Sequence, residues 1–281
     1  MKTFKPKVKS LAVLLIILQF WGCASEHNQI SGSQSVSGDT ANEVALGKQI
    51  HELIVSRIPV CPNEEVDRYV QSIGRQIARY AKRQEIPYEF IVLQDDRMYA
   101  TSSPGGFVYI TSGFLLFLKN EAELAFILAH EIGELQRKDP RLSHTRKIVE
   151  QLMKTGATVA PAFGGIGALA MLGVFGVYAM TNNDISKEER IYNADAKALE
   201  MMVNSGYDPQ GAFNVFYNIA NASSKELMYF YDYYQARPVT TARLARLERK
   251  FAQLDLSGKS FDMDRSHYMK MIEPLKSSQA V

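Results

Sequence analysis

The stretch ELAFILAHEIGELQR, residues 123–137, decides how the rest of the sequence is interpreted. Most of it is apolar, which predicts a buried helix, and its central polar residues are His130, Glu131 and Glu134. A solvated helix face would carry more charge than ILAHEIGEL does. These three residues are therefore candidate site residues rather than surface residues.

His130 and Glu131 match the start of the HExxH motif, in which two histidines one turn apart bind zinc and the glutamate is the general base. The second histidine would be residue 134, where the sequence has Glu134. A carboxylate is an acceptable zinc ligand. The helix therefore predicts either a metal site with an unusual ligand or a peptidase-like site that has lost its metal.

Outward from this helix, the sequence predicts a mainly helical α+β fold with a small sheet beside helix 121–137. YEFIVLQ (88–94) and the strand after the turn in PGGFVYITSG (104–113) are the predicted strands. One apolar helix face is formed by Val66, Val70, Ile73, Ile77 and Tyr80. Further helices are predicted at about 121–137, 140–155, 186–204, 209–220 and 239–253.

The N-terminus has the features of a signal sequence. Residues 1–22 combine four lysines with an apolar run, 11–18, that is too short to span a bilayer, and Gly22 precedes Cys23. This resembles a bacterial lipoprotein signal, cleaved before an acylated Cys23, and the absence of an aspartate after Cys23 implies the outer membrane, facing the periplasm. An uncleaved anchor and a plain secretory signal are the alternatives. Residues 23–42 are Ser/Gly-rich and predict a flexible tether.

Charge and cysteine content exclude some classes of protein. The formal net charge is +2, and it becomes −2 without the four lysines of residues 1–22, so nothing favours nucleic acid as a partner. If Cys23 is acylated, Cys61 has no second cysteine to pair with. The predicted folded domain, 43–255, then depends on its core alone, and residues 256–281 are predicted to be a C-terminal tail.

Residues 158–180, TVAPAFGGIGALAMLGVFGVYAM, contain no charge. Their length would allow a membrane span. Pro161 and five glycines favour a helical hairpin that is buried or contacts the membrane, because small residues let helices approach closely. A true span, and hence an integral membrane protein, is the alternative.

Four stretches together resemble the HtpX/CAAX-prenyl-protease family of zinc metallopeptidases, and within it the periplasmic lipoproteins. They are PGGFVYITSG, NEAELAFILAHEIGEL, NADAKALEMMVNSGYDP (193–209) and RPVTTARLARL (237–247). The resemblance covers roughly residues 43–253. It implies a zincin-like metallopeptidase domain with zinc as cofactor, His130 as first ligand, Glu131 as base and Asp195 supporting the ligands.

The remaining site positions depart from the family pattern. Glu134 replaces the second histidine, and the third ligand should fall at residue 191, which is Ile191. Arg237 stands at the position of a family histidine. Glu188, Glu189 or Asp195 would have to be recruited to complete a zinc site. Alternatively, Arg237 pairs with Glu134 or Glu131 and replaces the metal, because a guanidinium is a permanent, forked donor for carboxylates.

Three functions are compatible with these residues. The first is a lipid-anchored envelope protein without hydrolytic activity that binds unfolded or unassembled envelope proteins in quality control, using 107–111 as an exposed edge strand. The second is an active zinc metalloendopeptidase with a carboxylate-rich ligand set. The third is an integral membrane component that spans the bilayer with residues 158–180.

Overall fold

A computed structural model describes residues 32–136, 187–261 and 263–278. The chain divides into two units, Met1–Asp39 and Thr40–Val281, and the second contains the sheet and the core. The predicted signal peptide, Cys23, helix 140–155 and the apolar run 158–180 lie outside the described residues. Among the helices within them, none combines the length and the apolar character needed to cross a membrane.

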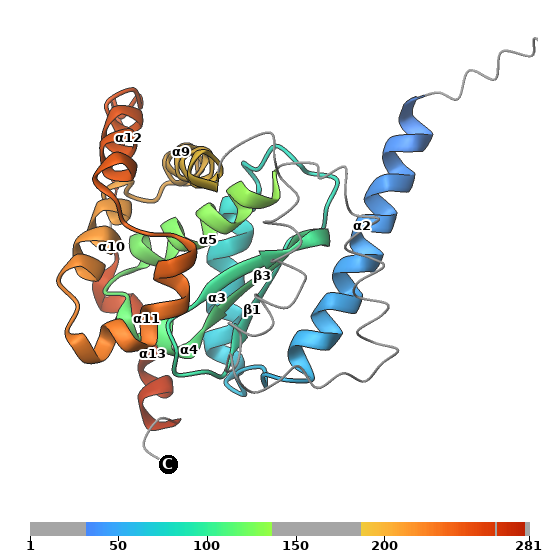
Figure 1. Ribbon diagram of the computed structural model, residues 1–281. Coiled ribbons are helices and arrows are strands. Elements are labelled where there is room, and N and C mark those ends of the chain that lie inside the picture. Colours follow the sequence, from blue (N-terminus) through green and yellow to red (C-terminus); the bar gives the residue numbers. More distant parts are fainter. Residues whose placement is uncertain (1–31, 137–186, 262, 279–281) are drawn as a thin grey trace, which may run out of the picture. The chain divides into compact units, whose positions relative to one another are not determined.

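The described chain is an α+β fold, mainly helical with one small sheet, as the sequence predicts (Figure 1). Its strands are β1 (Glu89–Leu93), β2 (Ala100–Ser103) and β3 (Phe107–Thr111), and a short 3-10 turn, η1 (Pro104–Gly106), separates the last two. Its helices are α2 (Gly32–Val55), α3 (Glu64–Ala78), α4 (Ser112–Phe117), α5 (Glu121–Leu135), α9 (Lys187–Ser205), α10 (Gln210–Ala220), α11 (Ser224–Ala236), α12 (Thr241–Phe251) and α13 (Arg265–Ser278).

The sheet has the order β1-β3-β2, with β1 parallel and β2 antiparallel to β3. The expectation that 107–111 forms an exposed edge strand is wrong, because β3 is the central strand and pairs on both sides. The C-terminal end of β1 is paired with residues 59–61, where Cys61 N donates to Val92 O at 2.8 Å. The strand on the other side of β3 is β2, and it lies at the edge of the sheet. Its sequence, ATSS, has no strand pattern and does not predict a strand.

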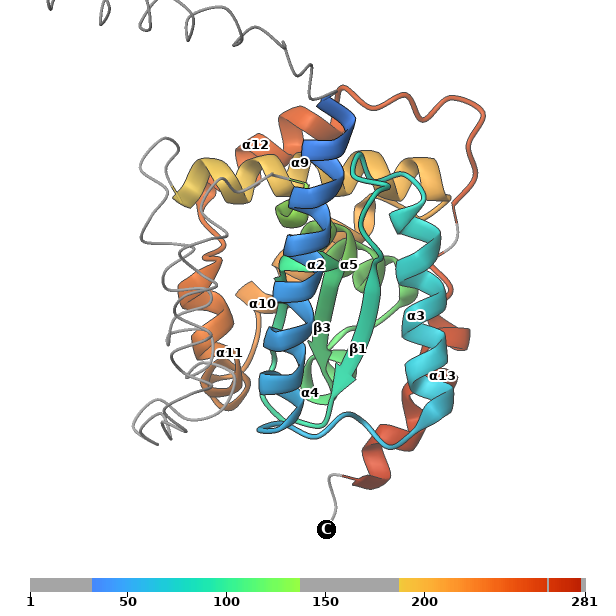
Figure 2. The same cartoon turned by 90° about the vertical axis from the view of Figure 1, so that its right-hand side faces the viewer.

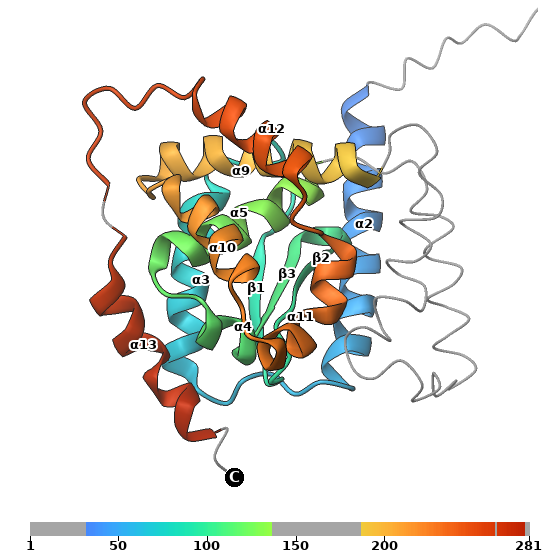
Figure 3. The ribbon, with the colours of Figure 1, turned by 60° about the vertical axis from the view of Figure 1, so that its left-hand side comes forward.

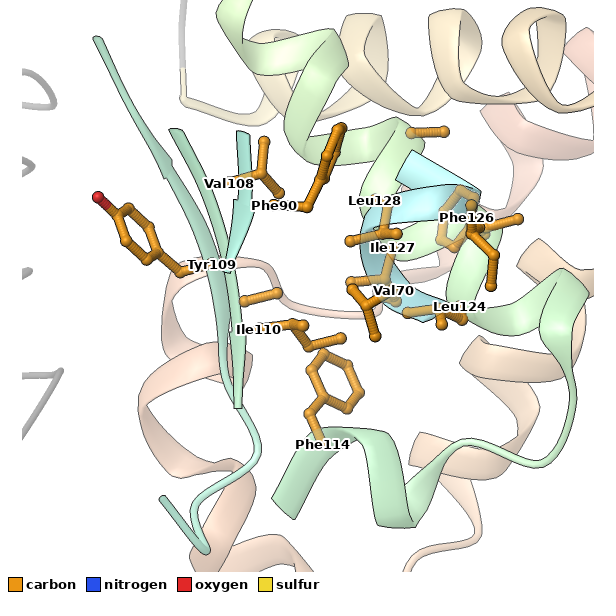
Figure 4. Packing of buried hydrophobic residues seen from close by; sticks show 14 of the residues in the cluster. Val70, Phe90, Val108, Tyr109, Ile110, Phe114, Leu124, Phe126, Ile127 and Leu128 are labelled. Atoms are coloured by element: carbon orange, nitrogen blue, oxygen red, sulfur yellow. The ribbon is translucent and has the colours of Figure 1, made fainter. Parts of the chain in front are cut away.

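The core lies between the sheet and helices α3 and α5. Figure 4 shows Val108 and Ile110 pointing from β3 toward Val70 of α3 and Leu128 of α5, whereas Tyr109 points the other way. On that opposite face the ring of His51, from α2, stacks on Phe107 with centroids 4.9 Å apart. Figure 2 is viewed from this side, with α2 in front of the sheet. The sheet is thus covered on both faces.

Helix α5 is buried on nearly all sides, so it forms the centre of the fold. Figure 3 shows α9 crossing α5, with α12 beside α9. At the crossing, a Cβ added to Gly133 would lie 2.9 Å from Ala194 O, so the two helices approach as closely as glycine permits. This contact brings the α9 residues near 191–195 to the part of α5 that carries the candidate site.

Besides the strands, three parts of the chain have a secondary structure or an exposure that differs from the sequence prediction. Helix α2 begins at Gly32, inside the stretch expected as a tether, because extending an already packed helix costs little per residue. Tyr80 lies beyond the end of α3 and is exposed rather than on its apolar face. The expected tail contains α13, which buries Tyr268 and Ile272 against the core.

Candidate functional site

The candidate site lies on α5, whose N-terminus is fixed by the side chain of Asn120. The Asn120 side chain accepts the N–H of Glu123 at 2.9 Å, so the helix starts at a defined residue. Three turns later, His130 and Glu131 are fully buried. Buried polar groups of this kind are stable only with hydrogen-bonding or charged partners.

His130 is held by Asp195 of α9, which is also buried. The two residues meet at 2.7 Å between His130 Nδ1 and Asp195 Oδ1. Arg243 donates to the same carboxylate through Nε at 2.7 Å and Nη2 at 2.9 Å. Burial raises the pKa of Asp195, but Arg243 and His130 outweigh burial and lower the pKa to about 2. An ionised Asp195 can only accept, so the Nδ1 of His130 carries a proton and donates it to this contact.

Arg237, from the connection between α11 and α12, occupies the other side of His130. Its Nε donates to His130 Nε2 at 3.2 Å, and its Nη2 donates to Glu131 Oε2 at 3.0 Å. The same nitrogen lies 2.8 Å from Glu131 Oε1. Ser102 of β2 adds a hydroxyl that donates to Glu131 Oε2 at 3.1 Å. The ion pair of Arg237 is therefore with Glu131 and not with Glu134.

Glu134 turns instead toward α9, where its Oε2 lies 3.5 Å from Arg190 Nη2. Ile191 is buried and offers no ligating atom. Glu188 is exposed, and Glu189 pairs with Arg246 at 2.8 Å. None of the acidic residues of α9 that might complete a metal site therefore faces His130 Nε2 in the described structure.

Zinc does not fit the side chains gathered here. A catalytic zinc site needs three protein donors and an open position. His130 Nε2, the nitrogen that would bind zinc, faces a guanidinium, and the third-ligand position is the aliphatic Ile191. A divalent ion beside Arg237 would meet a fixed positive charge within a few ångströms. Among the described residues, the charges of Arg237 and Arg243 already balance those of Glu131 and Asp195 without it.

Arg243 also fixes the segment that carries Arg237. Its Nη1 donates to the carbonyl oxygen of Arg237 at 3.0 Å, and its guanidinium lies 4.5 Å from the ring centroid of Phe216. The sequence does not predict the contacts of Ser102 and Arg190, because neither residue lies in a recognisable motif. Both become site residues only through the packing of β2 and α9 against α5.

A family model described as Peptidase family M48 matches residues 64–250. Among curated proteins, a putative beta-barrel assembly-enhancing protease of Vibrio cholerae is 23% identical over 201 residues, covering 66% of this chain and 40% of that protein. The beta-barrel assembly-enhancing protease of Yersinia pestis is 22% identical over 191 residues, covering 64% of this chain and 38% of its own. The beta-barrel assembly-enhancing protease of Escherichia coli K12 is 24% identical over 178 residues, covering 60% of this chain and 35% of that protein.

The chain therefore spans about two fifths or less of the length of these relatives. The family model, by contrast, extends from the start of α3 to the end of α12 and so includes the sheet, α5 and the whole buried network. On this match, the chain belongs to peptidase family M48.

Proposed function

We propose that this chain is an M48-family protein of the bacterial cell envelope that binds extended segments of other envelope proteins without hydrolysing them. The relatives named for β-barrel assembly support an envelope role, and so do the lipoprotein features of residues 1–23. Membrane attachment would come from acylated Cys23, and unfolded or unassembled envelope proteins would be the partners.

The observation that carries the loss of hydrolysis is the position of Arg237. In a zinc peptidase the glutamate after the first histidine must be free to take a proton from water. Here both oxygens of Glu131 lie within 3.0 Å of one guanidinium nitrogen, and Ser102 donates to one of them. A carboxylate in such a pair is a weak base, because accepting a proton would break its ion pair.

The surface we propose for binding is the outer edge of β2. All four of its residues are buried in this structure, with Ala100 0% and Ser102 6% exposed. In an antiparallel pair, every second residue bonds to the partner strand and the residues between them point away from it. The bond from Thr111 N to Tyr99 O, at 3.0 Å, shows which residues of β2 face β3. The N–H and C=O groups of Ala100 and Ser102 consequently point away from β3, and among the described residues they have no partner. An extended chain would add to them as a further strand once the atoms that cover this edge move aside, and main-chain pairing of that kind gives affinity without demanding a sequence.

The proposal is tested with fluorescent β-casein as an unfolded probe. We expect the protein without residues 1–22 to raise casein anisotropy and to release no fragments, with or without added zinc. Ala100→Pro removes an outward N–H and should weaken binding, and the exposed Arg79→Ala should leave it unchanged. Casein cleavage that Glu131→Gln abolishes would establish the active endopeptidase instead. Equal binding by Ala100→Pro and by a second edge variant, Ser102→Pro, would remove β2 from the proposal.

A further inference from the structure

Two of the three positions at which this chain departs from a zinc site, Glu134 and Arg237, each form an ion pair. Glu134 stands at the second-ligand position and is paired with Arg190, the residue just before the lost third-ligand position, Ile191. Arg237 replaces the family histidine and contacts both His130 and Glu131. Each of the two charged replacements is therefore paired with an opposite charge on another residue.

A zinc ion in a site of this kind would do two structural things. It would join α5 to α9 through ligands from both helices, and it would neutralise the carboxylates buried beside it. In this chain the pair of Arg190 and Glu134 joins α9 to α5. Arg237 joins the connection between α11 and α12 to α5, and it neutralises Glu131, whose side chain is 0% exposed.

We propose that Arg190 and Arg237 together take over the structural role of the metal, so that this M48 domain carries its own cations and folds without zinc. Arg237 is the stronger of the two, because its Nε and Nη2 reach two acceptors on consecutive residues of α5. Arg243 holds it in place through its main-chain carbonyl. Zinc and Arg237 exclude each other from His130 Nε2. The proposal does not depend on whether β2 binds a client.

The first experiment measures thermal unfolding in EDTA and in equimolar zinc. The wild type should melt at the same temperature in both. Arg237→Gln leaves Glu131 buried without a cation and should lower Tm by about 6–20 °C. Removing both charges, in Glu131→Gln/Arg237→Gln, should recover at least half of that loss. Arg68→Ala, which breaks an exposed ion pair with Glu64, is the matched control and should shift Tm by no more than about 2 °C.

The second experiment restores the ligands and measures bound metal after dialysis against zinc. Glu134→His/Ile191→Glu, which keeps Arg237, should retain no zinc. Adding Arg237→His should raise retention to about one ion per chain. Equal zinc uptake by the double and the triple variant would overturn the proposal, and so would a wild-type Tm that rises with zinc. A double variant Glu131→Gln/Arg237→Gln no more stable than Arg237→Gln would also overturn it. Neither measurement reports on casein binding, so the two proposals fail separately.

Discussion

The buried pair of Arg83 and Glu43 offers a quantitative test of how α2 is held to the rest of the domain. Arg83 Nη2 lies 2.6 Å from Glu43 Oε2 and Nη1 lies 3.0 Å from Oε1, so the contact is bidentate. The two side chains are only 6% and 8% exposed. Arg83 also donates to the carbonyl oxygen of Leu135, at the C-terminal end of α5, at 3.2 Å. One guanidinium therefore connects α2, the segment after α3, and α5.

The expected loss of unfolding free energy on breaking this pair follows from its geometry. Two unit charges about 4 Å apart attract by about 4 kcal/mol at an effective dielectric constant of about 20. Arg83→Gln would leave Glu43 buried and unpaired, and we expect it to cost about 3–5 kcal/mol of unfolding free energy. Glu43→Gln should cost less, because Arg83 keeps its bond to Glu85 at 2.9 Å. In the double variant, part of the loss should return, giving a coupling energy of about 2–3 kcal/mol.

Urea unfolding of the wild type, both single variants and the double variant measures this coupling energy. Glu64→Gln and Arg68→Gln form the matched control cycle, because that Arg–Glu pair has a similar contact distance, 3.0 Å, but is exposed. Its coupling should be no more than about 0.5 kcal/mol. A coupling for Arg83 and Glu43 that is no larger than the control would refute the idea that burial makes this pair a structural connection.

Three further outcomes are expected. Phe230→Ala should cost about 3–5 kcal/mol in urea unfolding, because this fully buried ring anchors α11; a loss below about 1 kcal/mol would show that α11 is held elsewhere. Gly133→Val should cost at least about 1–3 kcal/mol, because any Cβ there meets Ala194 O at 2.9 Å, and an unchanged urea midpoint would contradict that close approach. Burial raises the pKa of Glu121, against the bond from Tyr69, and it also raises the pKa of Glu123, so the wild type should lose stability as pH rises above about 4.5. Glu121→Gln should lose less, because only the contribution of Glu123 remains. Urea midpoints at pH 4 and pH 7 measure the difference, and parallel pH profiles would contradict it.

The elements that the sequence predicts well are those with strong periodicity or clear punctuation. The strand at 88–94 and the Pro104 turn are recovered within a residue or so, as is the helix around His130. β2 escapes prediction because ATSS has neither alternation nor large apolar residues. Strand order is not encoded in any local pattern, and for that reason the sequence alone places 107–111 wrongly at an edge. Helix α13 escapes prediction because Pro274 and its mixed composition interrupt the periodicity.

The candidate site is predictable only where a residue falls on a family position. Arg237 stands out because it occupies the place of an expected histidine, but the sequence leaves open whether it pairs with Glu131 or Glu134. The partner of Glu134, Arg190, and the hydroxyl of Ser102 depend on how α9 and β2 cross α5. Such contacts join residues far apart in the chain, and a single sequence gives no measure of their proximity.

The burial of α5 restricts the order in which mutations can accumulate around it. Replacing Arg237 with histidine would leave the buried carboxylate of Glu131 without its cation. Replacing Ile191 with glutamate would add a further carboxylate to the buried interior. Replacing Glu134 with histidine would release Arg190 from its carboxylate. Every one-step path back to a metal ligand set thus passes through a less stable intermediate, so these positions are expected to show strong epistasis and to change as a group in descendants of this chain.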